Sequence, residues 1–182
     1  MKVLKFGGTS VGSVDSIRQI QHIIGQQTDD CIVVVSALGG ITDQLLKAAH
    51  LALEAGEEYM EVYQAIRCRH MDMVNTLITN PTTRQMLCLE LEGILDELRS
   101  ILFGVHLVKD LSDKTEAAIV SYGERMSSRI VTAALPGAVR KNSLQFIRTE
   151  HKQGQVLLNT ELTEQLIRQA FSPIPHLSVV PR

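Results

Sequence analysis

A lysine and two adjacent glycines stand where the first short apolar run of the chain ends. The segment Lys5-Phe6-Gly7-Gly8-Thr9-Ser10 follows residues 3–6, which we predict to form a strand. Glycine lets a backbone approach an anion closely and present its N–H groups, and a lysine on the strand adds positive charge. The segment therefore suits a phosphate-binding turn, although a plain strand-end turn beside a solvated lysine also explains it.

A second glycine turn repeats this arrangement further along the chain. The residues Ser36-Ala37-Leu38-Gly39-Gly40-Ile41-Thr42-Asp43 close the apolar run Cys31 to Ser36 and open a helix. Backbone N–H groups, the positive end of the helix dipole and the hydroxyls of Ser36 and Thr42 would together suit a carboxylate or a phosphate. Thr42 has a structural alternative as the N-cap of its own helix.

The third candidate is Ser121-Tyr122-Gly123-Glu124-Arg125-Met126-Ser127-Ser128, inside a helical pattern. A glycine within a helix costs up to about 1 kcal/mol relative to alanine, which indicates that something must approach closely at Gly123. Glu124 is the charge of interest. Its alternative is an exposed carboxylate that pairs along the helix surface, with Arg125 as its partner.

Two common nucleotide-binding fingerprints do not fit. Gly7 and Gly12 have the spacing of P-loop glycines, but Ser13-Val14 follow where that loop needs Lys and then Ser or Thr. The chain also lacks a GxGxxG segment. The cation lies upstream on the strand instead, which points to another way of handling phosphate.

Periodicity indicates an α/β fold with a mainly parallel sheet. A strand, a helix carrying Ile17, Ile20 and Ile24, and the β-branched strand 31–36 form a βαβ unit, and Thr42 opens the next helix. Apolar spacing over 57–103, broken at Asn80-Pro81, predicts a helical hairpin inserted in this domain. We then expect four more elements: a helix from Asp113 to about Leu135, a strand over 144–148, a helix over 160–171 and a strand over 176–180.

Composition excludes several classes of protein. The chain has 182 residues, 45% of them apolar, which is enough for one globular domain. A net charge of −2 without a basic block argues against nucleic acid, and no apolar run is long enough for a membrane or a signal peptide. Three cysteines and six histidines show no metal-binding spacing, so we expect no metal held by side chains alone. We expect a soluble, cytosolic protein.

Taken together and in this order, KFGGTS, SALGGITD and SYGERMSS closely resemble the aspartate kinase family. Other amino-acid kinases also begin with a lysine and two glycines, but Phe6, Thr9 and the Gly-Glu-Arg segment at 123–125 resemble aspartate kinase. The resemblance covers the whole chain. The helical insertion is similar to that of the lysine-sensitive branch and of aspartokinases fused to homoserine dehydrogenase.

The resemblance implies a fold and a set of roles. The fold would be the three-layer α/β/α sandwich of the amino-acid kinases, here its N-terminal, aspartate-binding lobe over 1–182. Lys5 would be catalytic and contact the transferred phosphoryl group, and the ATP phosphates would lie against Lys5, Gly7, Gly8, Thr9 and Ser10. Aspartate would be bound by Ser36, Gly39, Gly40, Thr42 and Glu124, with Glu124 on the ammonium group. No site residue is assigned after Phe146.

The implied reaction moves the γ-phosphoryl group of ATP to the side-chain carboxylate of L-aspartate and gives 4-phospho-L-aspartate. That carboxylate is ionised at neutral pH, so it needs no general base, whereas cations, oriented N–H groups and phosphate-bound Mg²⁺ must control charge. The family continues past the strand at 177–180 into a glycine-rich nucleotide segment and regulatory domains. We therefore expect this piece to be truncated and inactive alone, and the full-length protein to be a homo-oligomer.

Two alternatives stay open at this stage. One is an amino-acid kinase with another acceptor, such as glutamate, acetylglutamate or carbamate. The other is a non-catalytic binding or assembly module on the same lobe, for which the hairpin at 57–103 would form the partner surface.

Overall fold

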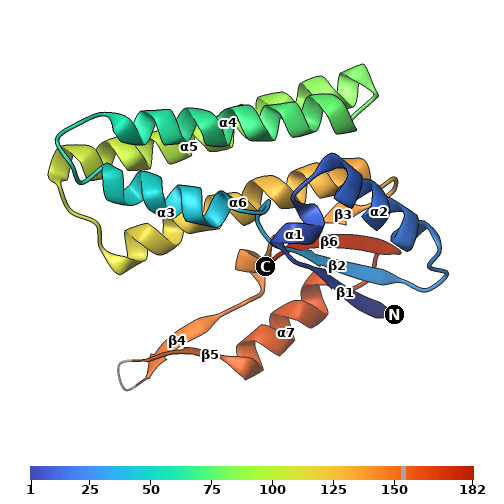
Figure 1. Cartoon of the computed structure of the whole chain (residues 1–182). Helices are drawn as coiled ribbons and strands as arrows, with labels where there is room; N and C mark the ends of the chain where they lie inside the picture. Colours follow the sequence, from blue (N-terminus) through green and yellow to red (C-terminus); the bar gives the residue numbers. More distant parts are fainter. Residues whose placement is uncertain (153–154) are drawn as a thin grey trace.

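A computed structural model of the chain describes residues 1–152 and 155–182. Its main sheet has four parallel strands in the order β1 (Lys2–Phe6), β2 (Cys31–Val35), β6 (Leu177–Pro181) and β3 (Val139–Arg140). Figure 1 shows β2 between β1 and β6, so the first two strands of the chain end side by side. The predicted α/β class with a mainly parallel sheet is confirmed.

Helices lie on both faces of this sheet, which gives the expected three layers (Figure 1). One face packs against α2 (Val14–Gly25) and α6 (Asp113–Ala134), and the other against α7 (Thr160–Ala170). The strand β2 alternates accordingly: Cys31, Val33 and Val35 are buried in the larger core, while Ile32 packs against the smaller cluster around Phe171. This alternation arises because successive strand side chains point to opposite faces.

Two short elements connect the strands to the helices that follow. The turn after β1 contains a single helical turn, α1 (Gly8–Val11), before Ser13 caps α2 by accepting from Ser16 N at 3.1 Å. The turn after β2 leads into α3 (Ile41–Leu51). Both helices begin at the carboxyl edge of the sheet, where open α/β folds bind their ligands.

The helical hairpin consists of α4 (Glu58–Leu77) and α5 (Pro81–Val108). Asn80 caps α5 through its side-chain oxygen, which accepts from Thr83 N at 3.0 Å, and Pro81 occupies the first helical position. The hairpin packs against α3 and α6 (Figure 1). The hairpin runs to Val108, five residues past the predicted end at 103, because its apolar spacing continues through Leu102 and Val105.

The predicted strand over 144–148 is wrong. Ser143–Gln145 forms a 3₁₀ turn capped by Asn142, and Phe146 then anchors the chain by packing edge-on against Phe171 with ring centroids 5.6 Å apart. The next residues form a separate antiparallel hairpin of β4 (Thr149–Lys152) and β5 (Gln155–Leu158). The packing of the buried Phe146 ring, rather than an alternating apolar pattern, therefore determines the conformation of this segment.

Candidate functional site

The two glycine turns are in direct backbone contact. A Cβ atom built on Gly8 would lie 3.3 Å from the Ala37 carbonyl oxygen and 3.4 Å from Gly39 Cα, and one built on Gly39 would lie 3.1 Å from the Gly8 carbonyl oxygen. Ser36 N also donates to the Phe6 carbonyl oxygen at 3.2 Å, which continues the β1–β2 pairing to the edge. The adjacent strands thus bring both turns to one place, and only glycine allows this separation.

Backbone donors at these turns are left without acceptors in the described part of the chain. In the first turn Ser10 and Val11 donate to the Gly7 carbonyl oxygen and Gly12 donates to that of Thr9. The second turn closes with Ile41 N donating to Leu38 O. Among the other N–H groups of the two turns, those of Gly8, Thr9, Gly39 and Gly40 make no backbone hydrogen bond. Four unused donors on two touching turns form a surface suited to anionic oxygens.

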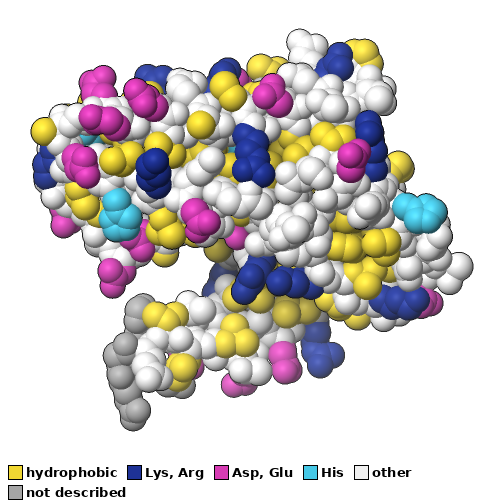
Figure 2. Space-filling model, viewed as in Figure 1, with side chains coloured by type: hydrophobic (Ala, Val, Ile, Leu, Met, Phe, Trp, Pro, Cys, Tyr) yellow, Lys and Arg dark blue, Asp and Glu magenta, His cyan; other side chains and the backbone are white. Residues whose placement is uncertain are grey.

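The lysine amine lies over the first turn. Lys5 Nζ is 4.0 Å from the position of a Cβ built on Gly7, and no ion pair within the described residues involves this exposed lysine. Figure 2 shows Lys and Arg side chains gathered at the centre of one face, beside the carboxyl ends of the strands that Figure 1 labels. The positive charge at this edge is therefore available to a ligand.

The hydroxyl-bearing residues predicted for the site lie on the same edge. Thr9 and Ser10 are exposed on α1, and Ser36 is half-buried at the end of β2. Gly40, with φ of 80°, is the N-cap of α3, so Thr42 falls inside the first turn and makes no capping hydrogen bond. The capping alternative for Thr42 is therefore wrong, and its hydroxyl is unused within the described residues.

The helix α6 is joined to the second turn by two contacts. Ser127 Oγ donates to the Ser36 carbonyl oxygen at 2.7 Å. A Cβ built on Gly123 would lie 2.7 Å from Ala37 Cβ and 3.3 Å from Leu45 Cδ1, so the helix backbone rests on the turn. The close approach predicted at Gly123 is thus a helix-packing contact. Ser127 Oγ also lies 3.3 Å from the Glu124 carbonyl oxygen, so the backbone of Glu124 lies near the end of β2.

Glu124 and Arg125 are not partners. Arg125 Nη2 donates to Glu97 Oε2 on α5 at 2.6 Å, and its guanidinium lies 4.2 Å from the Tyr122 ring centroid. The hydrogen bond from Arg125 holds the pKa of Glu97 below its usual value. Glu124 forms no ion pair with any described residue, so its carboxylate is left for a cationic group.

Replacing Gly123 by alanine tests the contact between α6 and the turn. The added methyl group must displace Ala37 or the helix, and overpacking of this kind costs about 1 to 3 kcal/mol of unfolding free energy. Gly93→Ala on α5 is the matched control, since nothing lies within 4 Å of its Cβ position. Because alanine favours a helix, this substitution should raise the unfolding free energy by as much as about 1 kcal/mol. Urea unfolding of both variants measures the difference, and equal stability of Gly123→Ala and wild type would contradict the packing argument.

Sequence reasoning missed one cation at this edge. Arg69 reaches across from α4: its Nη2 donates to the Gly12 carbonyl oxygen at 3.4 Å, and its Nη1 is 3.8 Å from the Cβ position of Gly40. Its helical spacing gives no sign of this, because the contact joins residues 57 positions apart. The side chain lines a shallow depression of about 470 Å³ together with Gly12 and Asp72.

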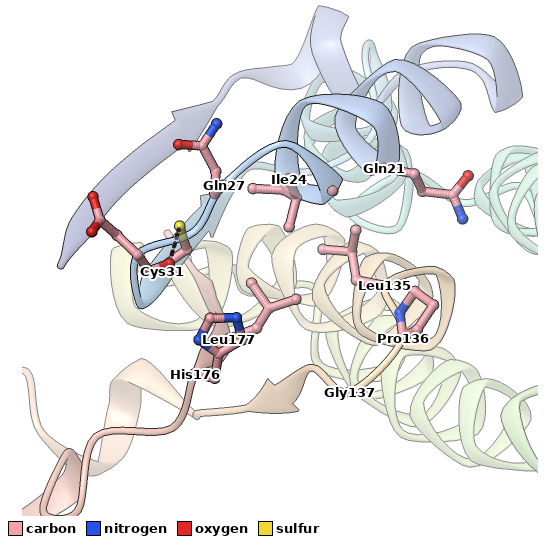
Figure 3. Close-up of a pocket in the computed structure, with 11 residues that line it drawn as sticks. Gln21, Ile24, Gln27, Cys31, Leu135, Pro136, Gly137, His176 and Leu177 are labelled. Atoms are coloured by element: carbon pink, nitrogen blue, oxygen red, sulfur yellow. Dashed lines mark hydrogen bonds between the residues drawn. The ribbon is translucent and has the colours of Figure 1, made fainter.

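Other features of the described residues lie outside this edge. A cavity of about 480 Å³ is lined by Cys31, Leu177, Gln21 and Leu135 (Figure 3), where β2 and β6 begin, about 13 Å along the strands from the turns. No group of three His, Cys, Asp or Glu residues in 1–152 and 155–182 has the arrangement of a metal site. No helix of the described chain is long and apolar enough to cross a membrane.

Comparison with known proteins places this geometry in a family. Residues 1–180 match the model of the amino acid kinase family. Aspartokinase 2, chloroplastic, of Arabidopsis thaliana is 32% identical over 137 residues, covering 73% of this chain and 24% of that protein. The bifunctional aspartokinase/homoserine dehydrogenase of Buchnera aphidicola is 30% identical over 141 residues, covering 74% of this chain and 17% of that protein.

Solved structures show the same fold. Aspartokinase III of E. coli, in complex with lysine and aspartate, superposes with a TM-score of 0.85 at 24% identity, covering 98% of this chain and 40% of that one. The aspartate kinase of Clostridium acetobutylicum gives a TM-score of 0.76 at 18% identity. The chain spans about a quarter of the length of the curated plant relative it matches. With its family model matched from residue 1 to residue 180, this chain belongs to the amino acid kinase family.

Proposed function

We propose that this chain is the amino-acid-binding lobe of an aspartate kinase, which phosphorylates the side-chain carboxylate of L-aspartate with ATP to give 4-phospho-L-aspartate. One observation carries the proposal: two glycine turns touch at the carboxyl edge of a parallel sheet, with the Lys5 amine over one and the backbone of Glu124 near the other. Aspartokinases among the relatives of this chain support the choice of acceptor.

The roles follow from the charges available at each turn. We assign the first turn to phosphate, because Lys5 supplies a cation there and Gly8 and Thr9 supply unused N–H groups. Gly7 would let the backbone approach the phosphates, and Ser10 would contribute its hydroxyl. The second turn would hold aspartate through Ser36, Gly39, Gly40 and Thr42, while the unpaired carboxylate of Glu124 attracts the substrate ammonium.

Phosphoryl transfer to a carboxylate mainly requires control of charge and distance. The acceptor carboxylate is ionised at neutral pH and repels a triphosphate, so the cation at Lys5 and the N–H donors lower the cost of their approach. The contact between the turns holds both groups at one edge, which favours an in-line arrangement of the reacting oxygens. ATP would supply the phosphoryl group, and Mg²⁺ carried on its phosphates would neutralise developing charge.

Equilibrium titration of this chain with ligands tests the proposal. We expect L-aspartate to bind more tightly than L-glutamate, N-acetyl-L-glutamate or carbamate. The measurement uses binding rather than turnover because the curated relatives are several times longer than this chain. Tightest binding of another acceptor would identify a different amino-acid kinase, and no binding of any acceptor or of MgATP would favour a non-catalytic module.

Substitution of Glu124 by glutamine separates the ammonium contact from the rest of the site. Loss of one charged hydrogen bond should weaken L-aspartate binding by roughly tenfold or more. Affinity for succinate, which lacks the ammonium group, and for MgATP should stay unchanged. Glu116→Gln, on the same helix but paired with His50, is the control. An equal loss for succinate would show that Glu124 acts on the fold rather than on the ammonium group.

Two further properties complete the proposal. We place the protein in the cytosol, although several relatives are chloroplastic enzymes. We also propose that the complete protein is a homo-oligomer, which sedimentation at several protein concentrations would test. A single monomeric species at all concentrations would contradict it.

A further inference from the structure

We propose that Arg69, delivered by the helical hairpin, binds a carboxylate of the amino-acid substrate at the second glycine turn. The inference rests on the proposed function and names a residue that the three sequence motifs do not contain. It also gives α4 a role in the site beyond packing.

The position of the guanidinium is the first argument. Arg69 Nη1 lies 3.8 Å from the Cβ position of Gly40, and Nη2 donates to the Gly12 carbonyl oxygen at 3.4 Å. Gly40 begins the helix that carries Thr42, and Gly12 ends the turn that carries Gly8. The guanidinium thus bridges the two turns, because it is bonded to Gly12 of the first and lies against Gly40 of the second.

The charge of this guanidinium is the second argument. Arg69 forms no ion pair within the described residues, although Asp72 lines the same depression. Arg67, two residues earlier on α4, is instead paired with Glu92 on α5 through two hydrogen bonds. The single weak hydrogen bond of Arg69 to Gly12 leaves most of its five donors unused.

The chemistry of guanidinium then selects the ligand. A planar guanidinium matches a carboxylate with two parallel hydrogen bonds, and an arginine is more readily desolvated than a lysine. The second turn is the one assigned to the amino acid, which carries two carboxylates, and no other unpaired cation among the described residues lies against Gly40. A carboxylate seated on the N–H groups of Gly39 and Gly40 would lie within reach of Arg69.

Three substitutions in the 182-residue chain test the inference by titration with L-aspartate. Arg69→Gln should weaken L-aspartate binding by roughly tenfold or more and leave MgATP binding unchanged. Arg69→Lys keeps the charge but loses the planar fork, so it should recover part of the loss. Arg67→Gln is the matched control on the same helix and should bind L-aspartate like wild type. Urea unfolding of each variant shows that the fold is retained.

Two analogues tell which carboxylate is bound. β-Alanine lacks the α-carboxylate, and L-asparagine lacks the side-chain carboxylate. If wild type and Arg69→Gln bind β-alanine equally well but differ in affinity for L-asparagine, Arg69 binds the α-carboxylate. If they bind L-asparagine equally well but differ in affinity for β-alanine, Arg69 binds the side-chain carboxylate. Either result supports the inference. An effect that persists undiminished with both analogues would mean that Arg69 only shapes the turns, and overturns it.

The remaining outcomes separate the inference from the proposed function. If wild type binds L-aspartate and Arg69→Gln binds it equally well, the inference fails and the proposed function stands. Equal weakening of MgATP and L-aspartate would make Arg69 a phosphate ligand or a structural residue, and it also overturns the inference. If wild type binds no L-aspartate, the proposed function fails and the inference fails with it.

Discussion

Replacing Lys5 by methionine is expected to weaken MgATP binding about 100-fold, or about 2.7 kcal/mol, because the phosphates lose their cation at the first glycine turn. Methionine keeps the unbranched shape and most of the length of the side chain, and it suits a strand whose neighbours are apolar. Since Lys5 is exposed and forms no ion pair within the described residues, the unfolding free energy should change by less than about 0.5 kcal/mol. Titration calorimetry with MgATP, together with urea unfolding, measures both quantities.

The same strand contains a matched control for this substitution. Lys2 lies at the amino end of β1, where it donates to Gln27 at 2.9 Å and pairs with Asp29 at 3.5 Å. Lys2→Met removes the same charge from the chain but leaves the carboxyl edge intact, so MgATP affinity should stay at the wild-type value. Similar losses in both variants would show that net charge, rather than the position of Lys5, controls binding.

Acid should unfold the protein partly by protonating His70. This histidine is fully buried on α4, where its Nδ1–H donates to the Ile66 carbonyl oxygen at 2.7 Å and its Nε2 has no hydrogen-bond partner among the described residues. Burial, reinforced by the charge of Arg69 and opposed by the Ile66 hydrogen bond, lowers the pKa of His70 from 6.5 to about 4. A second proton would place an N–H at Nε2 in the core without an acceptor.

The sign and size of the effect follow from proton linkage. Between pH 6.5 and 4 the unfolded chain binds a proton that the folded chain refuses, so stability falls as pH decreases through this window. The unfolding free energy that depends on neutral His70 is fully present above pH 6.5, is lost as pH falls to 4, and amounts to about 3 kcal/mol. This is the largest stability effect that we expect from one side chain.

His70→Leu measures this contribution directly. Leucine cannot titrate and carries no orphaned nitrogen, so the variant should gain about 3 kcal/mol relative to wild type when urea unfolding is moved from pH 7.5 to pH 4. The exposed His22 gives the control, and His22→Gln should keep the wild-type pH dependence. The argument fails if His70→Leu and wild type lose stability in parallel over this range.

The local elements of the site could be predicted from the sequence. An apolar run ending in two glycines gave β1 and its turn, the β-branched run 31–36 gave β2, and 3.6-residue spacing gave the helices that follow. These predictions succeed because strand and helix periods are set by contacts between near neighbours. The prediction of a strand over 144–148 fails because the conformation of this segment depends on a contact with a residue distant in sequence, the ring of Phe171.

The sequence by itself determined which groups carry charge and where the backbone can turn: Lys5 at a strand end, two glycine pairs, and Glu124 one residue after a helical glycine. Only the tertiary structure decided that the glycine turns touch, that Arg125 pairs with Glu97, and that Arg69 lies against Gly40. The physical reason is range. Turn and helix propensities act over a few residues, whereas these contacts join segments brought together by sheet order and hairpin packing, which no local pattern encodes.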